Sequence, residues 1–132
     1  MISEAALPDP TLKGLRILLV EDEAMVAMLI ESILDDLGCL VVECAASVPA
    51  ALEAIDSRQF DGALLDMNLG GSTVYPVAEI LSARALPFAF VSGYGPTADV
   101  EARFPNVAVL KKPFDAWHLA QLVKTEIALR LL

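Results

Sequence analysis

Five short aliphatic runs spaced along the chain constrain the fold more than any other feature of the sequence. Each run is continuous rather than alternating, which is typical of strands buried on both faces of a sheet. We expect strands at 15–20, 40–44, 61–66, 87–92 and 106–110. Segments with helical periodicity lie between these runs. This alternation of strands and helices predicts an α/β fold, in which helices cover both faces of a parallel sheet.

The first helix is predicted from its apolar spacing. It begins at Ala24 and is expected to end at Gly38, a residue type that favours helix C-termini. Its buried face would consist of Val26, Leu29, Ile33 and Leu37. Met25 and Met28 fall outside that face, close to the end of the preceding strand, so we expect them at the surface.

The later helices are predicted mainly from their capping residues. Ser47, Thr73 and Asp115 are side chains able to cap the first turn of a helix. A short helix fits between Thr97 and Phe104, because Pro105 follows. The last helix is expected to run to Leu132. Its apolar stripe would consist of Leu119, Leu122, Val123, Ile127 and Leu131.

Length and charge narrow the possible functions. The 132 residues correspond to one domain, which we expect to comprise a leader at 1–14 and a folded domain at 15–132. The net charge of −9 argues against nucleic acid as a partner, because its phosphates require a basic surface. The longest apolar run, at 85–91, is far shorter than the roughly 20 residues that span a membrane, which argues against a membrane protein.

The N-terminus and the cysteines indicate the compartment. Residues 1–12 show no secretory signal. Cys39 and Cys44 would point to opposite faces of a strand, which argues against a disulfide between them. We therefore expect a reduced, soluble, cytoplasmic protein.

Polar residues follow the predicted strands at the edge where open parallel sheets place their sites. Glu21 and Asp22 follow the first strand, Asp66 the third, Ser92 the fourth and Lys112 the fifth. If the first and third strands are neighbours, three carboxylates converge. Two like charges 4 Å apart repel by about 4 kcal/mol at an effective dielectric constant of 20, so such a cluster requires a raised pKa or a cation. Mg²⁺ suits a site of few carboxylates.

This combination of side chains indicates phosphoryl chemistry. An aspartate can accept a phosphoryl group covalently. Mg²⁺ and a lysine neutralise charge on the transferring oxygens, and a serine hydroxyl can donate a hydrogen bond to the product. The sequence therefore predicts a site that accepts phosphoryl groups.

Four motifs at the strand ends resemble the receiver domain of two-component response regulators, and the resemblance covers residues 15 to about 130. The motifs are Ile17 to Glu23, Asp61 to Asp66, Val91-Ser92-Gly93 and Lys112-Pro113-Phe114. The resemblance implies a flavodoxin-like five-stranded parallel sheet in the order 2-1-3-4-5. It also implies Asp66 as phosphoacceptor, Lys112 and Ser92 as the residues that assist it, and Mg²⁺ held by Glu21, Asp22, Asp66 and the backbone carbonyl of Asn68.

The same resemblance implies partners and a mode of action. The phosphodonor would be a sensor histidine kinase or a histidine phosphotransfer protein, and Met25 and Met28 are candidates for docking it. No output domain is expected after the last helix, so the chain would signal by protein–protein interaction or phosphorelay. It would be a signalling module that catalyses only its own phosphorylation and dephosphorylation, rather than a metabolic enzyme.

The sequence departs from the common receiver pattern near the phosphoacceptor. Gly70 and Gly71 replace the usual proline, so we expect a more mobile loop, and Val109 stands where most receivers carry an aromatic switch residue. The segment from Phe90 to Gly95 is similar to an atypical receiver subgroup with a Phe-Ala-Thr-Gly-Gly-Tyr motif. That similarity makes Tyr94 the candidate switch or gating residue.

Two other functions fit parts of the pattern. One is a small phosphatase or phosphotransferase with an aspartate nucleophile, although Asn68 occupies the position of the general acid expected there. The other is an interaction module that works without phosphorylation, although Asp66, Asp22, Ser92 and Lys112 are all present.

Overall fold

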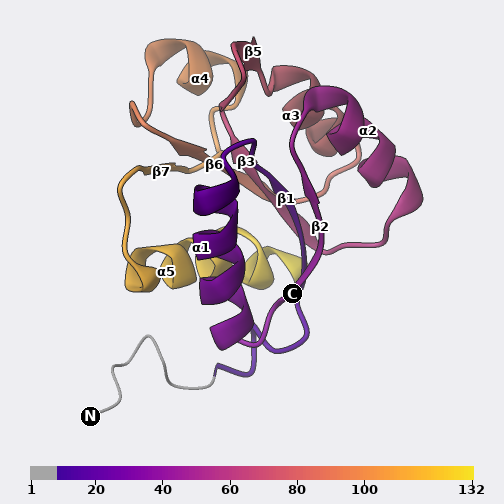
Figure 1. Cartoon of the computed structure of the whole chain (residues 1–132), viewed down its shortest axis with the longest axis vertical. Coiled ribbons are helices and arrows are strands. Elements are labelled where there is room, and N and C mark those ends of the chain that lie inside the picture. The colour runs from indigo at the N-terminus through magenta and orange to yellow at the C-terminus, as the bar shows by residue number, and fades with distance from the viewer. Residues whose placement is uncertain (1–8) are drawn as a thin grey trace.

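The computed structural model describes residues 9–132, which form a five-stranded parallel sheet between two layers of helices (Figure 1). The sheet consists of β1 (Arg16–Val20), β2 (Leu40–Ala45), β3 (Gly62–Asp66), β6 (Phe88–Ser92) and β7 (Val109–Lys111). Its order is β2-β1-β3-β6-β7. Counted along the chain without the short hairpin, this is the predicted order 2-1-3-4-5, and the flavodoxin-like fold is confirmed.

The helices divide between the two faces of the sheet. Helices α1 (Ala24–Asp36) and α5 (Ala116–Glu126) cover one face, and α2 (Val48–Ser57), α3 (Tyr75–Ala83) and α4 (Ala98–Arg103) cover the other (Figure 1). Successive residues of β1 point to opposite faces, as in any strand. Ile17 and Leu19 pack with α1 and α5, whereas Leu18 and Val20 pack with the other three helices. No helix within residues 9–132 has the length and apolar character to cross a membrane.

The buried face of α1 differs from the predicted one. Its buried residues are Ala27, Ile30 and Leu34, whereas Leu29 is 51% exposed. The predicted stripe was right in part. Val26, Ile33 and Leu37 are half-buried and pack against the core, whereas Leu29 was misplaced because residues 24–30 are apolar almost all round the helix. Met25 and Met28 are 85% and 68% exposed, as predicted.

Two helix ends also differ from the prediction. Ser47 and Asp115 cap their helices as predicted, but Thr73 does not: α3 begins after Val74, and Thr73 lies in a short strand. The last α-helix ends at Glu126 and gives way to a 3₁₀ helix, η2 (Ala128–Leu131), so it does not run to Leu132. Leu131, predicted to lie on the buried stripe, is largely exposed.

A two-residue turn at Gly70 and Gly71 forms a hairpin that the sequence analysis did not predict. Strand β4 (Asn68–Leu69) pairs antiparallel with β5 (Ser72–Thr73) directly after the end of β3. Both glycines have positive φ, 57° and 90°, which is the requirement of the tight turns that close hairpins. The expected mobile loop therefore has a defined backbone, built on the two residues that suggested mobility.

Residues 9–14 pack against the domain. Leu12 is buried between α1 and α5, and Lys124 Nζ lies 3.0 Å from Asp9 Oδ2. The remaining residues of the expected leader, 1–8, lie outside the described part of the chain. Both cysteines are free thiols, in agreement with the expected absence of a disulfide between them.

Candidate functional site

The carboxyl ends of β1 and β3 bring three acidic side chains together. The two strands are neighbours, and Val20 pairs with Leu65, so Glu21 and Asp66 emerge side by side at the same edge of the sheet. Carboxylate oxygens of Glu21, Asp22 and Asp66 lie within 4.8 Å of one another. The convergence predicted from the strand ends is therefore present.

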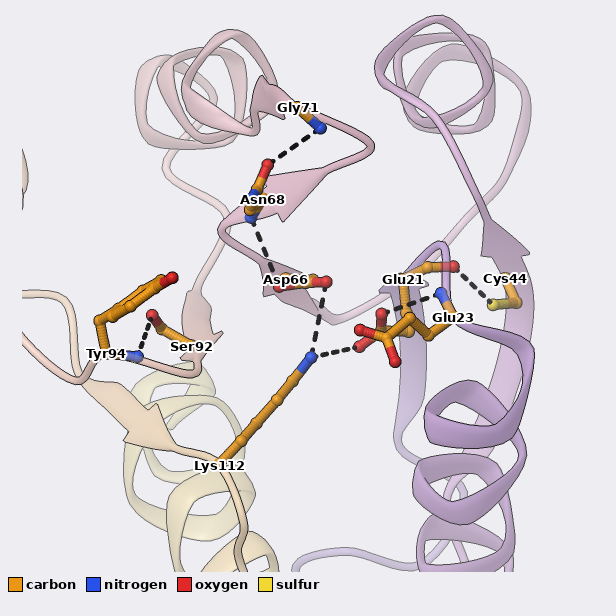
Figure 2. A network of polar contacts seen from close by, with 9 residues as sticks. All are labelled: Glu21, Glu23, Cys44, Asp66, Asn68, Gly71, Ser92, Tyr94 and Lys112. Atoms are coloured by element: carbon orange, nitrogen blue, oxygen red, sulfur yellow. Dashed lines mark hydrogen bonds and ion pairs between the residues drawn. The ribbon is translucent and has the colours of Figure 1, made fainter.

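Lys112 reaches into this acidic cluster from the end of β7 (Figure 2). Its Nζ lies 3.1 Å from Glu21 Oε1 and 3.6 Å from Asp66 Oδ2. The backbone N–H of Lys112 donates to the carbonyl of Ser92, which fixes the start of the loop after β7. Burial lowers the pKa of Lys112, but the hydrogen bond to Glu21 and the charge of Asp66 outweigh it, and the net pKa is raised. The neighbouring Lys111 is exposed.

Glu21 is the most enclosed of the three acids, with a side chain only 1% exposed. Burial, followed by its contact with Asp66, raises the pKa of the Glu21 carboxyl above its ordinary value, and the Lys112 ammonium opposes this rise. The backbone N–H of Glu23 donates to Glu21 Oε2 at 3.1 Å. The pocket therefore gathers three carboxyl groups around the ammonium of Lys112.

Ser92 ends β6 on the other side of Asp66. The pairing of Asp66 with Val91 places Ser92 one residue beyond the phosphoacceptor candidate. Ser92 is buried, and its Oγ accepts a hydrogen bond from the backbone N–H of Tyr94 at 3.1 Å (Figure 2). The Tyr94 side chain is 86% exposed. Its role as a switch residue stays a prediction.

Asn68 lies at the start of the hairpin beside Asp66. Its backbone N–H donates to Asp66 Oδ1 over 3.4 Å, and its side-chain oxygen accepts from the Gly71 N–H at 3.1 Å. These contacts hold the hairpin against the acidic cluster. The role of the Asn68 carbonyl as a metal ligand stays a prediction.

The donor set fits a hard divalent cation. All three side-chain ligand candidates offer carboxylate oxygens, the ligands that Mg²⁺ prefers. Glu21 and Asp66 are buried, whereas Asp22 is exposed, so the cluster is open to water on one side. Mg²⁺ keeps several water ligands, which this open side allows. The chemistry of the residues therefore matches a magnesium site.

The sequence analysis missed the residues that form the wall opposite Asp66. A cavity of about 230 Å³ beside the phosphoacceptor candidate is lined by Asp66, Ser92 and Tyr94, and also by Tyr75 and Thr97. Tyr75 is the first residue of α3, and Thr97 caps α4. No spacing in the sequence links these residues to Asp66, because the packing of α3 and α4 on the sheet brings them together.

Comparison with known proteins identifies the family. The model of the response regulator receiver domain matches residues 17–124. The chain belongs to this receiver domain family. Receiver domains are modules of two-component signalling rather than metabolic enzymes, and family members generally bind Mg²⁺ in an acidic pocket. No curated protein sequence matches the chain.

Solved structures of two proteins, SdrG and PhyR, are similar to this receiver domain. SdrG from Sphingomonas melonis Fr1 is 38% identical, with a TM-score of 0.73 over 90% of this chain and 98% of SdrG. The BeF₃-activated conformation of SdrG is 39% identical, with a TM-score of 0.69 over 87% of this chain and 95% of that one. The response regulator PhyR from Brucella abortus is 25% identical, with a TM-score of 0.79 over 92% of this chain. This chain covers about half of the length of PhyR, 51%.

Proposed function

We propose that this receiver domain accepts a phosphoryl group on Asp66 from a phosphohistidine of a sensor histidine kinase or a histidine phosphotransfer protein. The observation that carries the proposal is the position of Lys112 Nζ, 3.6 Å from Asp66 Oδ2, in a pocket with two further carboxylates. A buried aspartate with a purely structural role would require a single partner. Here the carboxylates outnumber the ammonium, which leaves a place for a cation and for the charge of a phosphoryl group.

The transfer forms one bond and breaks one. An Asp66 carboxylate oxygen attacks the phosphorus, an O–P bond forms, and the P–N bond to the donor imidazole breaks. The imidazole nitrogen leaves with the electron pair of that bond and takes a proton from water. The product is an acyl phosphate on Asp66, which carries about 1.5 to 2 negative charges by analogy with other phosphorylated side chains and replaces the single charge of the carboxylate.

Lys112, together with Mg²⁺ when the three acids hold it, would compensate that charge. The Lys112 ammonium is held beside Asp66 by Glu21, so it is already in place when a phosphoryl group arrives. Mg²⁺, when held by Glu21, Asp22 and Asp66, would neutralise charge on the transferring oxygens. The buried Ser92 hydroxyl is free to donate a hydrogen bond to a phosphoryl oxygen, because its recorded bond with the Tyr94 N–H uses it as an acceptor.

The proposed switch is the loop that begins at Ser92. A hydroxyl drawn toward a phosphoryl group on Asp66 moves away from the Tyr94 N–H and loosens the loop. Val109 lacks the aromatic ring that couples this movement to the last strand in most receivers. Tyr94, at 86% exposure, has room to move and is the proposed gating residue.

The phosphodonor is proposed to dock on α1, where three apolar side chains lie exposed near the acidic pocket. Met25, Met28 and Leu29 are 85%, 68% and 51% exposed. Methionines form adaptable apolar contact surfaces. We expect Met25→Ala with Met28→Ala to slow phosphotransfer from the cognate donor without changing phosphorylation by a small acyl phosphate. Leu40→Ala, an exposed leucine at the far end of β2, is the matched control and leaves both rates unchanged.

Phosphorylation itself is tested with the purified protein, Mg²⁺ and a small acyl phosphate. We expect mass spectrometry to find one base-labile phosphoryl group, located on Asp66 by peptide mapping. Asp66→Asn abolishes the adduct, and the control Asp56→Asn, on the exposed face of α2, retains it. No adduct on the wild type, or an equal adduct on Asp66→Asn, would overturn the proposal. Steady turnover of generic phosphomonoesters would instead favour an aspartate-dependent phosphatase.

A further inference from the structure

Tyr75 connects α3 to α4 through contacts that take no part in the acidic site. Its Oη donates to Asp99 Oδ2 at 2.9 Å, and Arg103 Nε donates to Asp99 Oδ1 at 3.2 Å. The Arg103 guanidinium lies 4.9 Å from the centre of the Tyr75 ring, and the ring packs on Phe104 with centroids 5.6 Å apart. We call Tyr75, Asp99, Arg103 and Phe104 the α3–α4 latch.

Helix α4 has few other attachments to the domain. It has six residues, fewer than an isolated helix needs for stability, and Val100 is its buried residue. Phe104, at its end, packs on Phe88 and Phe90. Segments with few buried contacts open at the lowest free-energy cost in a folded protein. The latch is therefore a large part of what holds α4 in the position observed.

Empty space lies on both sides of α4. The cavity of about 230 Å³ between the start of α4 and Asp66 is lined by Tyr75 and Thr97. A groove of about 440 Å³ lies on the other side, between α4 and β7, and Val109 is part of its lining. A packed core resists displacement, whereas a short helix beside two cavities has room to shift toward them.

A short loop joins the acidic site to the α3–α4 latch. Ser92 is joined to Thr97 by a loop that contains Gly93 and Gly95, and Gly95 has a φ of 71°. Thr97 Oγ1 accepts from the Val100 N–H at 3.3 Å, so the end of this loop is the cap of α4. The loop that starts at Ser92, beside Asp66, therefore ends at the first turn of α4, where Asp99 lies.

We propose that the α3–α4 latch restrains α4 in the unphosphorylated domain and that phosphorylation of Asp66 releases it. This inference rests on the proposed function, which it deepens by naming the contact that sets the resting position of α4. Displacing the first turn of α4 separates Asp99 from the Tyr75 hydroxyl and removes Arg103 from the ring. Because the coupling is reciprocal, releasing the latch by mutation also favours the conformation that phosphorylation produces.

The first experiment measures amide hydrogen exchange over residues 98–104 of the unphosphorylated protein. Tyr75→Phe keeps the ring and removes the hydroxyl, and Asp99→Asn weakens both polar contacts. We expect each to raise exchange in α4 about two- to tenfold, the range for one lost hydrogen bond. Glu101→Gln changes the charge of the same helix at an exposed position and leaves exchange as in the wild type. Equal α4 exchange in Tyr75→Phe and Glu101→Gln, with unchanged circular dichroism, would overturn the latch.

The second experiment repeats the measurement with Mg²⁺ and acetyl phosphate, with the adduct monitored by mass. In the phosphorylated wild type, α4 exchange should rise to the level of Tyr75→Phe, whereas Tyr75→Phe itself should change little. An adduct that leaves α4 exchange in the wild type unchanged would overturn the release while the proposed function stands. Absence of an adduct would overturn the proposed function and the release together, and the first experiment alone would then decide the latch.

Discussion

Replacing Lys112 by methionine tests the electrostatics of the pocket most directly. Methionine keeps most of the volume of the side chain and removes its charge. At an effective dielectric constant of 20, charges 3.1 Å and 3.6 Å apart attract by about 5 kcal/mol each, so the ammonium balances a large repulsion among the acids. Desolvation already offsets much of that attraction, and breaking a fully buried ion pair costs about 3–5 kcal/mol. Because Lys112 is 20% exposed, we expect a smaller loss, about 2–3 kcal/mol in the free energy of unfolding.

The measurement is urea unfolding at pH 8 without divalent cations. The matched control is Lys111→Met, which changes the adjacent, exposed lysine and should stay within about 0.5 kcal/mol of the wild type. Mg²⁺ should then bind Lys112→Met more tightly than the wild type, because the lysine no longer competes for the carboxylates. Free Mg²⁺ at one hundred times its Kd adds about 2.7 kcal/mol to the free energy of unfolding, which is enough to recover most of the loss in Lys112→Met.

Two results would refute this reasoning. If Lys112→Met and Lys111→Met unfold at the same urea concentration, the ammonium does not hold the three acids together. If Lys112→Met is destabilised but its Mg²⁺ affinity equals that of the wild type, the lysine and the cation do not share carboxylates. The second result would show that Lys112 forms a structural ion pair and would remove the argument that it acts in the metal and phosphoryl site.

Three further predictions concern the packing and the metal. Hydrogen bonds from Thr11 lower the pKa of Asp9 to about 2. The ionised Asp9 therefore stabilises the fold at a pH above its unfolded pKa of 3.8, and this contribution disappears as the pH falls through 2. In urea unfolding, Asp9→Asn should have a lower free energy of unfolding than the wild type at pH 7, and the difference should vanish in acid. A Cβ at Gly62 would collide with Ile127 Cγ2, so Gly62→Ala should destabilise by about 1–3 kcal/mol, and Ile127→Ala should recover part of this in a double-mutant cycle. Asp22→Asn should leave the free energy of unfolding without metal unchanged, because Asp22 is exposed. It should raise the Kd for Mg²⁺ about tenfold, as measured by titration calorimetry, because Asp22 supplies one charged ligand.

The strands and the acidic cluster could be predicted from the sequence for the same reason. Strands buried on both faces are read from continuous aliphatic runs, and a parallel sheet gathers the residues that follow such runs at one edge. Glu21 and Asp66 each follow a run directly and Lys112 lies two residues after one, so locating the strands located the cluster.

The features that were not predicted depend on tertiary packing. The buried face of α1 was predicted only in part because Leu29 is as apolar as Ile30, and the sheet rather than the spacing decides which of the two it covers. The hairpin after β3 had a signal in the two adjacent glycines, which suit a two-residue turn as well as a mobile loop. The contact between Tyr75 and Asp99 had no signal, because it joins two helices separated by a strand.

The sheet also separates two layers of helices that pack independently of each other. The helices on one face, α1 and α5, and those on the other, α2, α3 and α4, pack on alternate residues of the same buried strands. A substitution among the exposed residues of α1, such as Met25, therefore leaves the packing beneath α4 untouched. If the phosphodonor docks on α1 as proposed, its contacts can therefore change on the first face without repacking the helices on the second or displacing the acids at the strand ends.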